Sequence, residues 1–331
     1  MNLSTIYMGL ALKNPLVASA SPLTGDLDNI RRLEDAGAAA VVLPSLFQEE
    51  IEADEARYDR LTDSGEWAES SGHFTPLANY AHGPGQYLDL IARASETAGI
   101  PVIASLNGIG NEGWIAYART IEEAGAKGIE LNIYFIPAHL GETGAEVERR
   151  YLDILTAVRA AVSIPLAVKL SPYFSSLGNT ALAFQKAGAN ALVLFNRFYQ
   201  PDIDIGRLSV LTDLHLSDPS EIRLPLLWLA VLRGRLTASL GATTGVDSAA
   251  EVVKYLLAGA DAVMTTSSLL RHGIGHMAVL LEGLESWMAA RGFERLDQVR
   301  GIMSQQKLRD PLAFERANYI RILQGYRPGV R

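Results

Sequence analysis

The sequence predicts an α/β fold in which strands and helices alternate and close into a (β/α)₈ barrel. The first observation is a short pattern, a helix end followed by glycine and an apolar run, which occurs at 35–43, 123–131, 186–194 and 257–265. The second is a pair of apolar runs that begin directly after Pro101 and Pro165. Glycine commonly follows a helix end, and proline is tolerated at the first residue of a strand. The runs are continuous rather than alternating, which is typical of parallel strands covered on both faces.

Eight strands are expected in chain order, at 16–19, 40–43, 102–106, 128–131, 166–170, 191–194, 236–239 and 262–265. Amphipathic stretches that suit helices lie between most of them, for example at 28–36, 114–124, 147–162 and 248–258. Eight such units favour a closed TIM barrel. An open doubly wound sheet is the alternative, and it is disfavoured because no GxGxxG motif follows the first strand.

Three segments lie outside the repeat. Residues 1–15 are expected to form an N-terminal cap, and residues from about 282 to 331 a C-terminal helical tail, all within a single domain, 1–331. The stretches 47–84 and 197–224 are long βα loops after strands two and six, where loops of this length form binding walls or lids. The acidic beginning of the first loop is equally compatible with a solvated helix.

The composition excludes several classes of protein. The net charge is −8 and no basic stripe is present, which argues against nucleic-acid binding. The chain has no cysteine, so disulfides, thiolate metal sites and a cysteine nucleophile are excluded, and the six histidines show no metal-binding spacing. No apolar run approaches the roughly 20 residues of a membrane helix, and no signal peptide is visible. We expect a cytoplasmic protein with no metal site and no membrane contact.

Polar side chains gather at the expected C-terminal ends of the strands, where barrels of this type carry their chemistry. These residues are Ser19, Asn107, Asn132, Lys169 and Asn196. Asparagine offers both a hydrogen-bond donor and an acceptor, so a ring of asparagines suits a flat heterocycle with alternating carbonyl and N–H edges. The sequence therefore predicts a site for a small planar molecule at this end of the barrel.

Two stretches after the last two strands predict a phosphate site. Residues 241–245 begin and end with glycine, which allows the backbone to approach an anion closely, and residues 266–269 supply hydroxyl and N–H groups at a short helix start. Phosphate binding after strands seven and eight is frequent in these barrels. Neither stretch is specific alone, and their occurrence together at these strands carries the prediction.

Lys169 lies within an apolar run, so its ammonium group needs a partner. Three roles are open from the residues alone. The lysine could hold negative charge on a reduced flavin ring, it could form a Schiff base as in aldolases, or it could pair with an acid inside the barrel.

Taken together, these motifs resemble the dihydroorotate dehydrogenase family over most of the chain. The similar stretches are 9–19, 130–132 and 168–172, Asn196, Gly241 and the pair Thr266-Ser267. The resemblance implies an FMN-dependent enzyme that oxidises dihydroorotate to orotate in pyrimidine biosynthesis by hydride transfer to the flavin, and a homodimer acting on a small molecule. It assigns cofactor contacts to Ala18, Ser19, Asn107, Asn132, Lys169, Gly241, Thr266 and Ser267, and substrate contacts to Asn79, Asn132 and Asn196.

The chain departs from the family pattern in the loop after strand four. The family's general base, a cysteine or serine, falls on Phe135, and the family's second asparagine falls on Pro137. Phenylalanine cannot accept a proton. Tyr134 and His139 are the nearest titratable residues in the sequence and become the candidate catalytic bases beside Lys169.

Two smaller departures concern the flavin and substrate pocket. The lysine that follows strand two in many members is absent from the stretch Leu43-Pro44-Ser45, and the first glycine of the phosphate turn is Leu240. The alternatives to dihydroorotate oxidation are therefore an FMN oxidoreductase for another cyclic amide or an enone, a flavin-free Schiff-base lyase that uses Lys169, and a non-catalytic binding protein.

Overall fold

The computed structural model describes residues 1–52, 83–108, 114–197, 201–211 and 213–325. In this part of the chain, eight parallel strands close into a barrel. In barrel order they are β3 (Leu16–Ala18), β4 (Ala40–Phe47), β5 (Val102–Asn107), β6 (Gly128–Asn132), β7 (Leu166–Leu170), β8 (Ala191–Leu194), β11 (Ser239–Ala242) and β12 (Ala262–Thr265). The predicted (β/α)₈ barrel is confirmed, and the open sheet is excluded.

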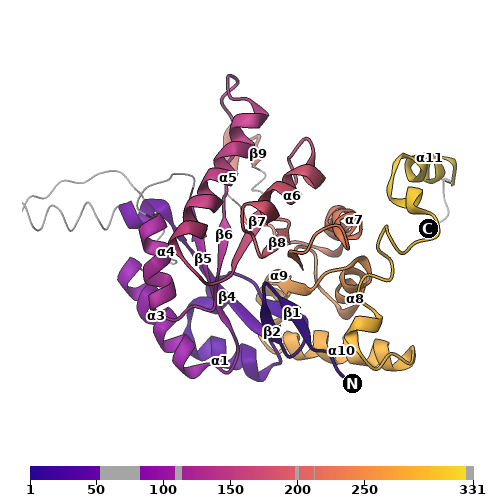
Figure 1. The fold of residues 1–331 in the computed structure, drawn as a ribbon, viewed down its shortest axis with the longest axis horizontal. Coiled ribbons are helices and arrows are strands. Elements are labelled where there is room, and N and C mark those ends of the chain that lie inside the picture. The colour runs from indigo at the N-terminus through magenta and orange to yellow at the C-terminus, as the bar shows by residue number, and fades with distance from the viewer. Residues whose placement is uncertain (53–82, 109–113, 198–200, 212, 326–331) are drawn as a thin grey trace, which may run out of the picture.

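Helices surround the barrel on its outside (Figure 1). They are α1 (Leu27–Asp35), α3 (Pro84–Thr97), α4 (Trp114–Glu123), α5 (Gly144–Ala161), α6 (Leu177–Lys186), α7 (Arg223–Leu232) and α8 (Ala249–Ala258). The four glycines of the repeated pattern all have positive φ, between 103° and 127°, at Gly37, Gly125, Gly188 and Gly259. This conformation ends each helix and turns the chain into the next strand. The main apolar core lies between these helices and the barrel wall.

The chain before the first barrel strand forms a small antiparallel hairpin of β1 (Thr5–Tyr7) and β2 (Leu10–Leu12). Tyr7 and Met8 are fully buried and pack within a second cluster with Val193 and Met264, in the barrel lumen. The Met8 N–H donates to Ser239 Oγ at 3.0 Å, at the beginning of β11. The hairpin therefore closes the N-terminal end of the barrel and leaves the C-terminal end for polar residues.

The seventh strand lies later in the chain than the sequence predicts. It was expected at 236–239, but β11 begins at Ser239 and ends at Ala242. The backbone N–H groups of Thr237 and Ala238 instead donate to Gln185 Oε1, at 2.6 and 3.0 Å. This contact with the end of α6 makes the earlier stretch a connection, so Ser239 lies at the N-terminal end of the barrel.

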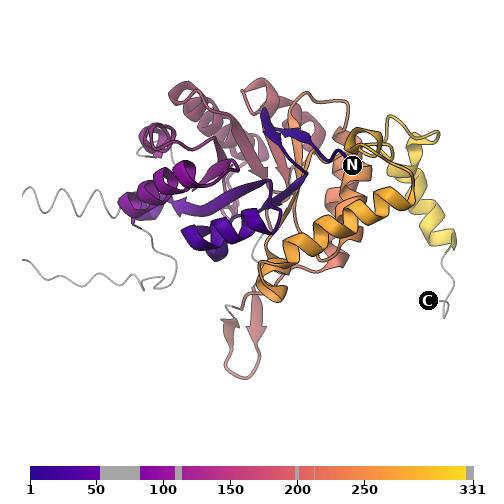
Figure 2. The ribbon, with the colours of Figure 1, turned by 90° about the horizontal axis from the view of Figure 1, so that it is seen from below.

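The long segment after β8 contains a hairpin of β9 (Asp202–Asp204) and β10 (Ser209–Leu211), followed by the 3₁₀ turn η2 (Pro219–Ile222). Figure 2 shows this hairpin projecting from the barrel. The other long segment, after β4, is helical at 48–52, and its following residues, which include Asn79, lie outside the described residues.

The C-terminal part is helical, as the sequence predicts, with α9 (Ser267–His272), α10 (His276–Ala290) and α11 (Arg316–Gly325), and the 3₁₀ turns η3 (Leu296–Gln298) and η4 (Pro311–Phe314). Helix α10 begins six residues before the expected boundary and packs on α8. In the part of the chain that the structure describes, no helix is long and apolar enough to cross a membrane.

Asp261 ties the C-terminal segment to the barrel. Its Oδ1 accepts from Arg233 at 2.8 Å and lies 3.1 Å from Arg300, and its Oδ2 accepts from the Leu240 N–H at 2.9 Å. The carboxylate is buried, so its loss leaves two cations without their partner.

We expect Asp261→Ala to lower the free energy of unfolding by about 3 kcal/mol, because buried ion pairs are costly to break from one side. Urea denaturation measures this value. Asp297→Ala is the matched control, since Asp297 pairs with Arg295 on the exposed surface, and we expect a change below about 0.5 kcal/mol. Equal losses in the two variants would contradict the assignment.

Candidate active site

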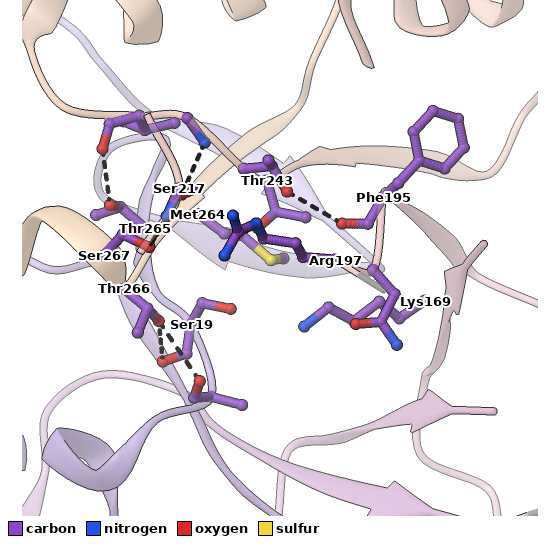
Figure 3. Close-up of a pocket in the computed structure, with 15 residues that line it drawn as sticks. Ser19, Lys169, Phe195, Arg197, Ser217, Thr243, Met264, Thr265, Thr266 and Ser267 are labelled. Carbon is purple, nitrogen blue, oxygen red and sulfur yellow. Dashed lines mark hydrogen bonds between the residues drawn. The ribbon is translucent and has the colours of Figure 1, made fainter. Parts of the chain in front are cut away.

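A pocket opens at the C-terminal end of the barrel, where β3, β7, β8, β11 and β12 finish. It encloses about 500 Å³ of space, including its open mouth. Its lining residues are Ser19, Ala20, Lys169, Phe195, Asn196, Arg197, Ser217, Thr243, Thr244, Gly245, Val246, Met264, Thr265, Thr266 and Ser267. Figure 3 shows Lys169 and Arg197 extending into the space that the hydroxyl side chains line.

One end of the pocket is formed by the turn after β11. Thr244 and Gly245 both have positive φ, 80° and 71°. A Cβ atom on Gly245 would lie 2.6 Å from the carbonyl oxygen of Asp218, so the position requires glycine for space as well as for conformation. The Gly245 N–H donates to Ser217 Oγ at 3.1 Å. The backbone of this turn is therefore held against the loop that carries Ser217.

The beginning of α9 completes the same end of the pocket. Ser217 donates through its backbone N–H and its hydroxyl to Ser267 Oγ, at 3.1 and 2.9 Å. Thr266 Oγ1 donates to the carbonyl oxygen of Ser19 at 3.0 Å, which ties α9 to the end of β3. Hydroxyl groups and the first N–H groups of a helix, beside a turn with positive φ, are suitable for an anion such as a phosphate.

The charge of the lining is one-sided. Lys169 and Arg197 are the two charged residues among the 15 that line the pocket, and no aspartate or glutamate is among them. Arg197 Nε donates at 3.0 Å to Oε2 of Glu221, which lies outside the lining. Its Nη1 donates to the His215 carbonyl. These contacts fix the guanidinium beside the pocket, where it favours an anionic ligand.

The other end of the pocket carries Lys169 and the Asn196 carboxamide, which is bonded to Asn132 behind it. Asn196 Nδ2 donates to Asn132 Oδ1 at 2.5 Å, and Asn132 Nδ2 donates to Ser45 Oγ at 3.5 Å. Ser45 Oγ lies 2.8 Å from Ser105 Oγ. This chain of four side chains crosses from β8 to β5 and fixes the orientation of both asparagines. Lys169 Nζ donates to Glu130 Oε1 at 3.3 Å, from inside the barrel wall.

Comparison with known proteins agrees with this geometry. The family model described as dihydroorotate dehydrogenase matches residues 2–288. The chain belongs to the dihydroorotate dehydrogenase family. The members of this family are flavoproteins, so the chain is a flavin-dependent oxidoreductase that acts on CH–CH groups.

The similar curated proteins cover most of this chain at low identity. The catalytic subunit of dihydroorotate dehydrogenase B (NAD(+)) from Thermoplasma acidophilum is 27% identical over 91% of this chain and 98% of the relative. The same subunit from Methanocella arvoryzae is 28% identical over 89% of this chain and 95% of the relative. The NAD-dependent dihydropyrimidine dehydrogenase subunit PreA of Escherichia coli is 23% identical over 91% of this chain and 76% of the relative.

The pocket brings together five of the residues that the resemblance to this family assigns. They are Ser19, Lys169, Asn196, Thr266 and Ser267. Asn132 lies one hydrogen bond outside the lining, through Asn196. Asn107 ends β5 and pairs in register with Asn132, also outside the lining.

Two predicted cofactor contacts lie away from the pocket lining. Gly241 is paired inside the barrel wall with Val193 of β8, and a Cβ atom on it would meet Tyr7 and Met264 in the lumen. Of the predicted phosphate turn 241–245, residues 243–245 line the pocket. Ala18 is buried within β3, and the residues that follow it reach the pocket instead.

The loop after β6 places neither candidate base in the pocket lining. His139 is exposed and accepts a hydrogen bond from the Gly141 N–H at 3.3 Å. Tyr134 is half-buried and does not line the pocket. Phe135 lies under the guanidinium of Arg150, 4.3 Å from the ring centre. The position of the family's base is thus occupied by a side chain held in a cation–π contact.

The sequence did not single out Arg197 and Ser217. Arg197 directly follows Asn196, and Ser217 lies in the segment 197–224 that was predicted to form a binding wall. The length of that loop and its place after β8 were the available signals, but they do not select a residue.

We expect Gly245→Ala to weaken flavin binding by about tenfold or more, because the added Cβ strains the turn that faces the pocket. Flavin absorbance per protein and a fluorescence titration of flavin-free protein measure the effect. Gly178→Ala in α6 is the control, since a Cβ there meets nothing within 4 Å. If both variants retained flavin as well as the wild type, this turn would not contact the cofactor.

Proposed function

We propose that the chain binds FMN in this pocket and exchanges a hydride between the flavin and a small cyclic amide. The observation that carries the proposal is one pocket whose lining has two cations and no acid. It joins a hydroxyl-rich end to an end with the Asn196 carboxamide and Lys169. Thr243, Gly245, Thr266 and Ser267 would hold the phosphate group. Lys169 and Asn196 would hold the ring.

The residues of the chain supply orientation and charge. When bound, the flavin supplies the hydride acceptor for oxidation of a CH–CH bond. The Lys169 ammonium stabilises negative charge at the ring end of the pocket. Asn132 and Asn196 present amide groups in a fixed orientation, which suits a substrate with alternating N–H and carbonyl groups.

The contacts of Lys169 argue against the Schiff-base alternative. A lysine that attacks a carbonyl must be the neutral amine. Glu130 Oε1 lies 3.3 Å from Lys169 Nζ, so the lysine is engaged in a buried ion pair. This is the pairing with an acid inside the barrel that the sequence left open, and it is compatible with the flavin role.

Dihydroorotate is the first substrate of the proposal, because its oxidation to orotate is the reaction named for the family. A second candidate is another cyclic amide or an enone. Phe135 and its contact with Arg150 favour this second candidate, since dihydroorotate oxidation also requires a group that takes a proton.

We expect dihydroorotate to reduce FMN slowly in the reconstituted wild-type protein under anaerobic conditions. Stopped-flow absorbance at the flavin band measures the rate. A protein that binds FMN but shows no bleaching at any dihydroorotate concentration would remove the first candidate and leave the second.

We expect Phe135→Ser to accelerate this reduction by about 10²-fold, because it restores a proton-accepting group at the family's position. Phe135→Leu is the control, since it removes the aromatic ring without adding a proton acceptor. An equal gain in both variants would show that access, rather than proton transfer, limits the rate.

A further inference from the structure

Lys169 takes part in a buried ion pair with Glu130. Lys169 is 9% exposed to solvent and Glu130 is 1% exposed. The two side chains project from adjacent strands, where Asn132 of β6 pairs in register with Lys169 and Glu130 lies two residues earlier. Lys169 also lines the pocket, whereas Glu130 does not. The carboxylate thus lies behind the ammonium, on the side of the closed lumen.

The lumen behind the pair is mostly apolar. The lumen cluster includes Val42, Ile103, Ala167 and Val193, and the hairpin closes it from the other end. A buried ion pair in such a place rarely stabilises a fold more than apolar residues of the same volume would. Packing therefore does not explain why a glutamate occupies this position. A requirement for charge on Lys169 explains it.

Glu130 has no competing partner among the described residues. Its Oε1 accepts from Lys169, and its Oε2 is buried without a hydrogen-bond partner in that part of the chain. The nearby Tyr7 hydroxyl is likewise buried and unpartnered there. Burial, and then the charges of Glu130 and Asp261, raise the pKa of Tyr7 well above its usual value, so Tyr7 is a neutral hydroxyl.

The other charged groups near the lumen and the pocket have partners of their own. Arg197, at the mouth, is held by Glu221. Asp261, toward the base of the barrel, is held by Arg233 and Arg300. Within the described residues, Glu130 is therefore the counter-charge for Lys169.

We infer that Glu130 is a positioning residue that keeps Lys169 protonated and directed toward the flavin. The inference rests on the proposed FMN site and adds a residue that does not itself touch the cofactor. Without the carboxylate, the buried ammonium is an uncompensated charge and releases its proton more readily as the pH rises.

Sulfite is the probe for this charge. Sulfite donates its lone pair to a nitrogen of the oxidised flavin ring, forms one S–N bond and leaves additional negative charge on the ring, with no electron donor or acceptor required. A cation beside the ring stabilises that charge. The bleaching of the flavin band then reports the charge of Lys169 without any substrate turnover.

The experiment compares FMN-loaded wild type, Glu130→Gln and Lys169→Met from about pH 6 to about pH 9. At the upper end, we expect Glu130→Gln to bind sulfite about tenfold more weakly than wild type, as Lys169→Met does. At the lower end, Glu130→Gln approaches wild type and Lys169→Met does not. Comparison at equal pH cancels the titration of sulfite itself.

Two further variants separate charge from packing. Glu130→Asp keeps the charge and changes the shape, and we expect sulfite affinity closer to wild type than that of Glu130→Gln. Tyr7→Phe removes a buried hydroxyl from the same lumen without a change of charge, and we expect wild-type affinity at every pH. Wild-type sulfite affinity of Glu130→Gln across the whole pH range would overturn the inference.

A measurement on flavin-free protein covers the remaining outcomes. We expect Glu130→Gln to lower the melting temperature by roughly 5 °C, and Glu130→Gln combined with Lys169→Met to recover part of this loss. If Glu130→Gln does not fold, recovery of a folded double variant supports the pair, and its failure overturns it. A wild-type protein that binds no FMN refutes the proposed function, while this cycle still tests the pair.

Discussion

The barrel lumen is filled from its N-terminal end, and the remaining structure depends on this constraint. Tyr7 and Met8 of the β1–β2 hairpin enter the lumen and pack against Val193 and Met264. Any ligand must therefore approach from the opposite end, where the strands finish. The ion pair of Lys169 with Glu130 lies at the boundary between this apolar filling and the polar pocket. The pair therefore connects the buried core, through Glu130, with the pocket that Lys169 lines.

The barrel was predictable because its signals are local. A glycine after a helix, with φ of 103° at Gly37 and 127° at Gly259, specifies the turn into the next strand without reference to the rest of the chain. Strand β11 was misplaced because its residues, Ser239 to Ala242, do not form the long apolar run that marks other strands. The preceding stretch is fixed instead by Gln185, a tertiary contact with no trace in the local sequence.

The site was predictable to the extent that strand ends define it. Lys169 and Asn196 could be assigned because parallel strands in a closed barrel finish at one end. Arg197 and Ser217 could not, because the path of the loop after β8 brings them to the pocket. The predicted anion turn 241–245 divides in the structure. Residues 243–245 line the pocket, whereas the missing side chain of Gly241 makes room for Tyr7 inside the barrel.

The division between strands and loops also separates the two halves of the chemistry. Groups that would hold the flavin project from β7, β8 and the turns after β11 and β12, which the closed barrel fixes. The proton-accepting group of the family belongs to the loop after β6, where Phe135 packs under Arg150, and Arg150 is paired with Glu142 at 2.5 Å. A loop can change its residues without disturbing the barrel. The family's fold and flavin therefore constrain hydride transfer in this chain more strongly than they constrain its substrate.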